Sequence, residues 1–144
     1  MSAVLVRPDA RPSEALLIEG YASLFGVEDR VGDKVRAGAF AAALRQRPVP
    51  MLLQHKAGAL AGHWVRMVED GRGLFVRGLV DRPTAKSMVR GGLNGLSIGF
   101  QPQVWTERPG GGRVLVKIDL MEVSLVTEPM LEPARFQVIA GLGK

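Results

Sequence analysis

Three polar residues, His55, Ser97 and Glu122, lie where a strand pattern would bury them or turn them toward a shared cleft. A serine hydroxyl is a weak nucleophile at neutral pH until a neighbouring imidazole accepts its proton. A carboxylate that orients this imidazole and stabilises its charged form completes the set. The three residue types therefore indicate acyl-transfer chemistry, with Ser97 as nucleophile, His55 as base and Glu122 as orienting acid.

The stretch around Ser97 has the pattern of a half-buried strand. Large apolar residues alternate with small ones, namely Leu96, Ile98 and Phe100 with Ser97 and Gly99 between them. Because residues i and i+2 share a face, Gly99 leaves space beside the Ser97 oxygen where a backbone segment can approach. That space suits a nucleophile, but the same pattern is also typical of an ordinary core serine beside a strand glycine.

Glu122 lies inside an apolar strand predicted at 114–127, which makes it the most informative of the three residues. An ionised carboxylate there would be unfavourable by several kcal/mol without a partner. A lysine or arginine is the structural candidate for this partner, and His55, at the end of a strand predicted at 49–54, is the functional one. Ser124 shares the strand face of Glu122 and is an alternative hydroxyl, better suited to hydrogen bonding near the site than to attack.

Other candidate chemistry is less well supported. His63 is the rival base, but its place beside Trp64 in mid-strand is typical of a surface or packing histidine. The spacing of the two histidines fits no standard metal-ligand motif, and the acidic loop at 26–38 lacks the full calcium-loop spacing. No metal and no cofactor are predicted. The order His, Ser, Glu and the absence of a Gly-x-Ser-x-Gly elbow argue against an alpha/beta hydrolase.

Periodicity and turn residues predict a mainly β fold with helices (α+β). About seven strands are expected, at 4–6, 15–25, 49–54, 60–68, 73–80, 95–105 and 114–127. Asp-Gly at 70–71 predicts a hairpin. The pattern predicts an interruption near Asp119 in the last strand, and Pro129 and Pro133 are expected to end the ordered part. The strand tally favours a closed or nearly closed antiparallel barrel with packed helices.

Two helices are expected to accompany the strands. One covers 39–47 and stops before Pro48, and the other covers 82–90. For the second helix, Asp81 is the candidate N-cap, Pro83 suits the first turn and Gly91 suits the stop. This helix leads the chain directly into the Ser97 strand.

The composition restricts the class of protein. A chain of 144 residues fits one domain, here divided into an N-terminal arm at 1–14, a main domain at 15–140 and a tail at 141–144. The absence of cysteine excludes disulfides and thiol nucleophiles. No export signal or membrane span is predicted, so we expect a soluble protein that is not exported. The net charge of +5 favours acidic partners, but scattered basic residues and 6% aromatics do not indicate a nucleic-acid platform.

Five sequence blocks together carry a family resemblance. They occur in the order GYASLFG at 20–26, GAF at 38–40, LQH at 53–55, GLSIGF at 95–100 and EVSLVTEP at 122–129. In this combination, over about 18–136, the chain resembles the prohead (capsid) maturation protease family of tailed bacteriophages, prophages and gene transfer agents. Five blocks in register make the resemblance specific.

The resemblance implies a serine endopeptidase with a fold similar to the herpesvirus capsid protease, assemblin. It implies cleavage of the scaffolding part of the major capsid protein inside the immature shell, often with self-cleavage, in the cytoplasm of the bacterial host. Carried over by motif, the family histidine falls on His55, its serine on Ser97 and its acid on Glu122, whose place a histidine takes in the herpesvirus relatives. No cofactor or membrane is implied, and a homo-oligomer remains open.

The chain departs from the family pattern at two places. Lys56 stands where relatives often have aspartate, and 127–135 lacks the arginine pair that builds the oxyanion hole of the herpesvirus enzymes. The oxyanion donors are therefore not assigned. Two other functions stay open: a non-catalytic capsid-assembly or scaffold-binding module with the same fold, and a basic DNA-binding barrel whose affinity falls steeply with salt.

Overall fold

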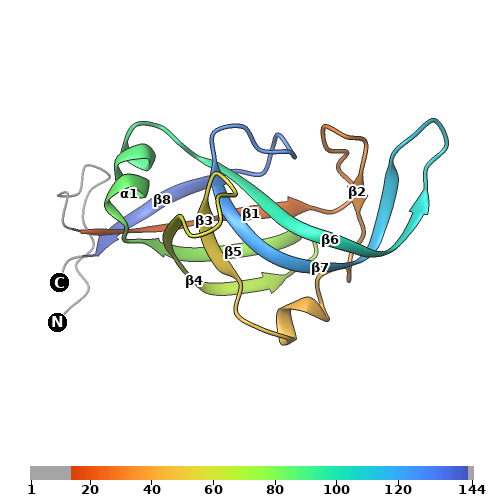
Figure 1. Ribbon diagram of the computed structural model, residues 1–144, viewed down its shortest axis with the longest axis horizontal. Coiled ribbons are helices and arrows are strands. Elements are labelled where there is room, and N and C mark those ends of the chain that lie inside the picture. Colours follow the sequence, from red (N-terminus) through yellow and green to blue (C-terminus); the bar gives the residue numbers. More distant parts are fainter. Residues whose placement is uncertain (1–13, 143–144) are drawn as a thin grey trace.

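The protein is built around one mixed sheet of eight strands (Figure 1). The computed structural model describes residues 14–142, so the strand expected at 4–6 lies outside the described part. The strands are β1 (Ala15–Leu24), β2 (Lys34–Val35), β3 (Pro50–Leu53), β4 (Leu60–Glu69), β5 (Gly73–Val80), β6 (Gly95–Glu107), β7 (Arg113–Val126) and β8 (Phe136–Leu142). One α-helix, α1 (Pro83–Arg90), and a 3-10 turn, η1 (Ala43–Arg45), accompany them.

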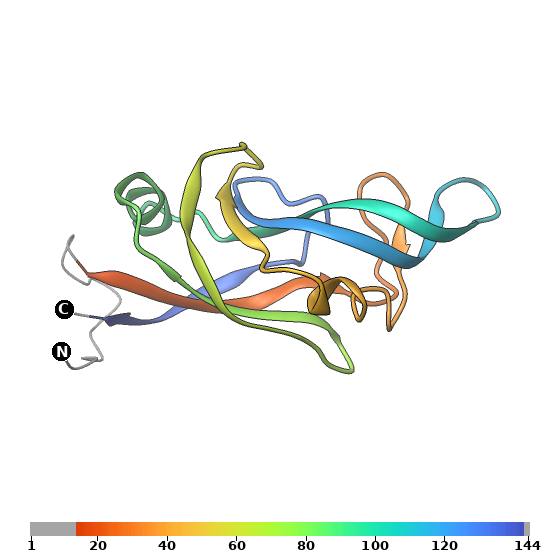
Figure 2. The ribbon, with the colours of Figure 1, turned by 60° about the horizontal axis from the view of Figure 1, so that its bottom comes forward.

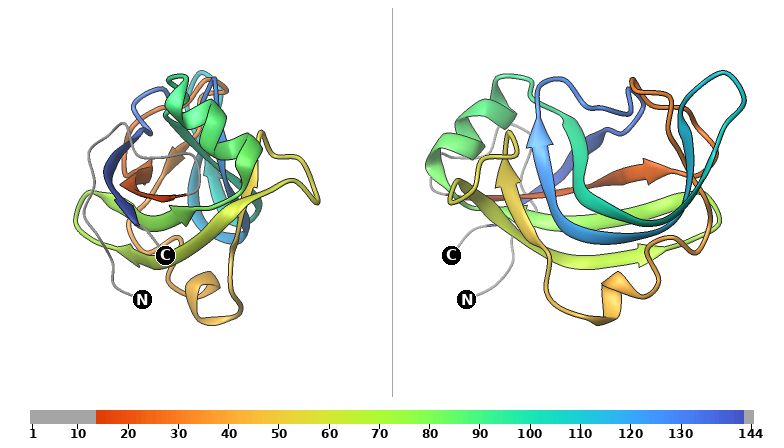
Figure 3. Two further views of the ribbon diagram at one scale, coloured as in Figure 1. Left: turned by 90° about the vertical axis from the view of Figure 1, so that its left-hand side faces the viewer. Right: turned by 45° about the vertical axis from the view of Figure 1, so that its right-hand side comes forward.

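The strands are ordered β2-β7-β3-β4-β5-β1-β8, and β6 pairs with β7. Strand β7 is the centre of this arrangement, because it is antiparallel to β6 and parallel to both β2 and β3. Figures 2 and 3 show the twisted sheet curling around its interior. The hairpin of β4 and β5 forms where the Asp-Gly turn predicts it.

The expectation of a closed or nearly closed antiparallel barrel is wrong in two respects. Two strand pairings are parallel, and the sheet does not close, since β6 and β8 are not paired with each other. One isolated bridge, between Gly95 and Arg135, links the start of β6 to the chain just before β8. Beyond that bridge the long hairpin of β6 and β7 runs away from β8 (Figure 1), which prevents a continuous ladder.

Alternating apolar residues on the strands form the core. The largest fully buried side chains come from most of the strands and from the turn before η1, and include Leu16, Ile18, Phe40, Met51, Leu74, Leu96, Leu115, Ile118, Leu120 and Leu125. Each such side chain stabilises the fold by about 1.5–3 kcal/mol through removal from water. The core therefore fixes the relative position of β3, β6 and β7, the three strands that carry the candidate site.

The second predicted helix is confirmed, whereas the first is mostly replaced by turns. Helix α1 has proline in its first turn and Gly91 at its C-cap, but its N-cap is Arg82 without a side-chain bond, so the assignment of Asp81 as cap is wrong. At 39–47 only η1 forms. The backbone N–H groups of Gly38 and Phe40 donate to Glu69 on β4 instead of joining a helix. In the described part of the chain, no helix combines the length and apolar character needed to cross a membrane.

The C-terminal part differs from the prediction at two points. Strand β7 continues without a break through Asp119, whose carboxylate pairs with Arg47 at 3.2 Å. The ordered part does not end at Pro133, because β8 follows and pairs with β1. The buried Phe136 and Ala140 give β8 its own share of the core, which outweighs the turn signal of the two prolines.

Candidate active site

His55 and Glu122 form the closest ionisable contact of the candidate site. His55 is the second residue after β3, and Glu122 lies on the neighbouring β7, so their parallel pairing brings together residues far apart in the sequence. The His55 Nδ1 atom is 2.6 Å from Glu122 Oε2. Within residues 14–142, the basic partner of the Glu122 carboxylate is therefore the histidine, and not a lysine or arginine.

Ser124 connects the two members of this pair. Its fully buried hydroxyl donates a hydrogen bond to Glu122 Oε1 at 2.5 Å and accepts one from the backbone N–H of His55 at 3.1 Å. Both carboxylate oxygens of Glu122 are thus engaged, one by the His55 ring and one by Ser124. Sequence analysis assigned Ser124 to hydrogen bonding near the site, and these two contacts agree with that assignment.

The backbone at His55 adopts an uncommon conformation. Gln54 and His55 both have positive φ, 55° and 59°, which is unfavourable by about 1–3 kcal/mol for each non-glycine residue. The Gln54 side chain fixes this turn, because it accepts a hydrogen bond from the Thr127 N–H at 3.1 Å and donates one to Thr127 Oγ1 at 3.3 Å. Sequence analysis missed these positioning contacts, since the only available signal was a polar pair at the end of an apolar strand.

Ser97 lies beside this cluster without a hydrogen bond to it. In the β6–β7 register Ser97 is directly opposite Ser124, so the two side chains lie on one face of the sheet. Ser97 is buried, with 5% of its surface exposed. Within residues 14–142 its hydroxyl has no hydrogen-bond partner. The structure thus joins His55, Glu122 and Ser124, and it places Ser97 next to Ser124.

Gly99 provides space for Glu122 and not for a backbone segment. The two residues are opposite each other on β6 and β7. A Cβ atom built on Gly99 would lie 2.1 Å from Glu122 Oε2, the same oxygen that contacts His55 Nδ1. The imidazole therefore lies toward β6, on the face that also carries Ser97.

The environment of His55 sets its protonation behaviour. The hydrogen bond to Glu122 and the charge of that carboxylate raise the pKa of His55 above its ordinary value, whereas partial burial lowers it. Because Nδ1 faces the carboxylate, a neutral His55 has its proton on Nδ1 and its lone pair on Nε2. This is the tautomer that a general base for a serine hydroxyl requires.

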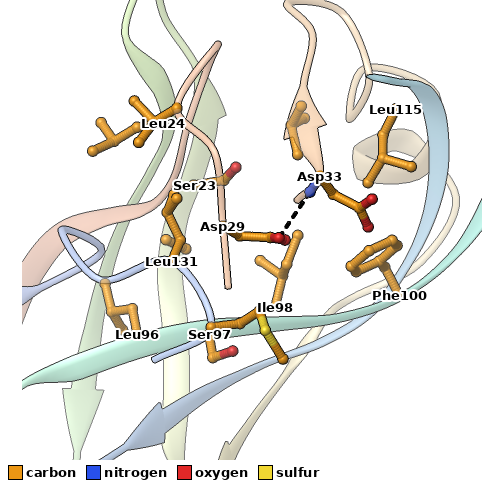
Figure 4. A pocket seen from close by; sticks show the side chains of 14 residues that line it. Ser23, Leu24, Asp29, Asp33, Leu96, Ser97, Ile98, Phe100, Leu115 and Leu131 are labelled. Carbon is orange, nitrogen blue, oxygen red and sulfur yellow. Dashed lines mark hydrogen bonds between the residues drawn. The ribbon is translucent and has the colours of Figure 1, made fainter. Parts of the chain in front are cut away.

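A mainly apolar pocket borders Ser97 on β6 (Figure 4). Its cavity volume is about 40 Å³, room for only a few water molecules, and its lining residues include Ala22, Leu24, Leu96, Ile98, Phe100 and Leu131. Asp29 and Asp33 lie on one side of it, and Asp33 is held by Arg113 at 2.7 Å. Leu96 and Ile98 alternate with Ser97 along β6, so their side chains reach the pocket from the sheet face opposite to the one that carries the Ser97 hydroxyl.

His63 lies outside this cluster. Its Nδ1 atom is 3.6 Å from Asp81 Oδ2, and 59% of its side chain is exposed, which identifies it as a surface histidine. Within the described residues, no group of three or more His, Cys, Asp or Glu side chains is arranged to hold a metal ion.

Comparison with known proteins decides the family. The model of the Caudovirus prohead serine protease family matches residues 4–142. This chain belongs to that family. The prohead protease of Enterobacteria phage HK97 is 36% identical over 130 residues, which are 82% of this chain and 57% of that protein. The chain thus spans little more than half the length of this relative of the prohead protease family.

Solved structures show the same fold at low sequence identity. The capsid assembly protease gp21 of bacteriophage T4 matches with a TM-score of 0.60 and 16% identity, over 88% of this chain and 90% of that one. The KSHV protease, solved with a hexapeptide phosphonate inhibitor, matches with a TM-score of 0.57 and 13% identity, over 85% and 64%. The predicted herpesvirus-protease-like fold is confirmed, as an open mixed sheet.

Proposed function

We propose that this chain is a serine endopeptidase of phage-like capsid maturation, with residues 15–140 as its protease domain. Its substrate is the scaffolding part of the major capsid protein, and it acts inside the prohead in the bacterial cytoplasm. The chain itself is a second candidate substrate. The proposal draws on the family membership and on one observation above all: the 2.6 Å contact between His55 and Glu122 on the sheet face that carries Ser97.

In the proposed reaction, Ser97 Oγ attacks the carbonyl carbon of the scissile peptide bond while His55 Nε2 takes the hydroxyl proton. Glu122 stabilises the imidazolium that forms and keeps the ring in one orientation. His55 then gives the proton to the departing amine, which leaves an ester between Ser97 and the acyl part of the substrate. Water hydrolyses this ester with His55 again acting as base. The proposed reaction steps use no metal or cofactor.

The proposed proton transfer requires His55 Nε2 and the Ser97 hydroxyl to come within hydrogen-bond distance. The Ser97 hydroxyl is free of hydrogen bonds to the rest of the described chain, so it can rotate without breaking one. Catalytic hydrogen bonds are often long or absent before substrate binds and form only in the complex. The polar face that both residues share is therefore compatible with the proposed proton transfer.

The decisive experiment is Ser97→Ala tested on a capsid precursor. We expect cleavage to fall by at least about 10³-fold, because removal of a nucleophile leaves only binding and electrostatic stabilisation. A fluorophosphonate probe should label the parent protein and not the variant. Ser87→Ala, on the exposed side of α1, is the matched control and should cleave normally.

Unchanged cleavage in Ser97→Ala would overturn the proposal. If the parent protein neither cleaves the precursor nor reacts with the probe but still binds the scaffolding segment, the chain is a binding module with the same fold. Salt-sensitive binding to DNA in place of both results would favour the nucleic-acid barrel.

A further inference from the structure

The reason for glycine at position 99 is steric and not conformational. Gly99 is absent from the described residues that have positive φ, so its backbone conformation is open to any amino acid. A Cβ atom at this position would, however, lie 2.1 Å from Oε2, 2.6 Å from Cδ and 2.8 Å from Cγ of Glu122. These are three successive atoms of one side chain, so rotation of the carboxylate alone cannot relieve the overlap.

The position that Glu122 takes over Gly99 is the one in which it reaches His55. Its Oε2 atom both overlaps the missing Cβ and contacts His55 Nδ1 at 2.6 Å. Its Oε1 atom accepts the hydrogen bond of Ser124. A side chain at position 99 would push Glu122 out of this place and so break both contacts at once.

We propose that Gly99 is a positioning residue: the absence of a side chain there allows Glu122 to lie across β6 and hold the imidazole of His55 beside Ser97. The catalytic meaning of this role rests on the proposed protease function. The contact itself does not, and it can be measured in a protein that cleaves nothing.

The first test is a histidine titration by NMR in the Ser97→Ala background, which prevents self-cleavage. The sequence has only two histidines, so a His63→Gln variant assigns the signals. We expect Gly99→Ala to lower the pKa of His55 to the value found in Glu122→Gln, because the carboxylate that raises it has moved away. An unchanged His55 titration in Gly99→Ala would overturn the proposal.

Gly78→Ala is the matched control for steric damage. A Cβ at Gly78 would lie 2.6 Å from side-chain atoms of both Met51 and Trp64 and 2.9 Å from the His63 carbonyl oxygen, so this variant is at least as crowded, but not against Glu122. We expect it to leave the His55 titration unchanged. An equal shift in Gly78→Ala would mean that general loosening of the sheet, and not the Glu122 contact, controls the histidine.

A second test truncates the Glu122 side chain, with which a Cβ atom at position 99 would overlap. If Gly99→Ala destabilises the protein, the double variant Gly99→Ala/Glu122→Ala should recover stability, because the truncated side chain no longer reaches position 99. Thermal unfolding of the four members of this cycle gives the coupling directly. Equal destabilisation by Gly99→Ala with and without the Glu122 side chain contradicts the proposal.

In the active protein, we expect Gly99→Ala to lower kcat/KM on a capsid precursor by about 10²- to 10³-fold, the same loss as for Glu122→Gln, because both changes remove the carboxylate from His55. The acid limb of its pH profile should move to lower pH, as in Glu122→Gln, and adding Glu122→Gln should cause little further loss. A loss of activity without that pH shift overturns the proposal. If the parent protein cleaves nothing, the protease function fails, and the NMR titration still decides the role of Gly99.

Discussion

Two histidine–carboxylate pairs occur within the described part of the chain, and they differ in distance and in burial. His55 and Glu122 are 2.6 Å apart, with just 13% of the Glu122 side chain exposed. His63 and Asp81 are 3.6 Å apart, and their side chains are 59% and 41% exposed. Exposed pairs of this kind contribute little, because water screens the charges. An acid near a histidine is therefore not sufficient evidence for a catalytic pair.

The difference between the two pairs lies in what surrounds the carboxylate. Glu122 is fixed by the Ser124 hydroxyl and lies in the space left by Gly99, so one orientation is selected. His55 is itself fixed by the turn that Gln54 clamps to Thr127. Asp81 contacts two exposed side chains, His63 and Arg82, which impose no single geometry.

The largest expected effect separates the two histidines. His55→Ala should lower kcat/KM on a capsid precursor by at least about 10³-fold, since it removes the proposed base. His63→Ala should stay within about twofold of the parent protein, as expected for a surface substitution. Measured cleavage rates for both variants test this. Equal losses would mean that the geometric distinction between the two pairs has no functional meaning.

The next effect separates the two acids. Glu122→Gln should lower kcat/KM by about 10²- to 10³-fold, because the imidazolium loses its stabilising charge and its ring orientation. Asp81→Asn should have no measurable effect. Rates measured from pH 5 to pH 9 give a second readout, since loss of Glu122 lowers the pKa of His55 and moves the acid limb to lower pH. An acid limb of the pH–rate profile that stays at the same pH in Glu122→Gln would contradict the role given to Glu122.

A smaller effect is expected from Ser124→Ala. This change removes one hydrogen bond to Glu122 and one from the His55 backbone, each contributing about 1 kcal/mol. We expect a loss of about tenfold in kcat/KM, with Ser87→Ala as control. A loss as large as that of Ser97→Ala would instead identify Ser124 as the attacking hydroxyl.

The smallest effect concerns stability. Because Glu122 raises the folded-state pKa of His55, this pair stabilises the fold fully below the unfolded histidine value of about 6.5 and loses that contribution as pH rises through the raised value. The His55 ring is partly exposed, so the contribution should stay below about 1 kcal/mol. Urea unfolding of Ser97→Ala, with and without Glu122→Gln, should differ more at pH 5.5 than at pH 9. An equal or larger difference at pH 9 would contradict the sign.

Local sequence signals accounted for much of the fold. Asp-Gly at 70–71 predicted the β4–β5 hairpin, Pro83 and Gly91 bounded α1, and alternation identified the Ser97 strand. The parallel pairing of β3 with β7 had no such signal, because it joins segments separated by some seventy residues. Strand β8 was missed because the prolines before it are typical of a chain end.

The residue types of the candidate site could be predicted from the sequence, but the contacts that position them could not. The need of Glu122 for a partner followed from its apolar surroundings, and the structure supplies His55. The positive φ angles of Gln54 and His55 were not predictable, since no glycine or asparagine marks a left-handed turn at either position. The role of Gly99 depends on a cross-strand register that the sequence alone does not define.

Strand β7 determines at which point of folding the candidate site can form. It borders both β3 and β6, and it carries Glu122 and Ser124 itself. A nascent chain that has not yet delivered this strand has its histidine and its serine on segments with nothing between them. If His55 and Ser97 act together as proposed, the candidate site cannot assemble before β7 has paired with both β3 and β6.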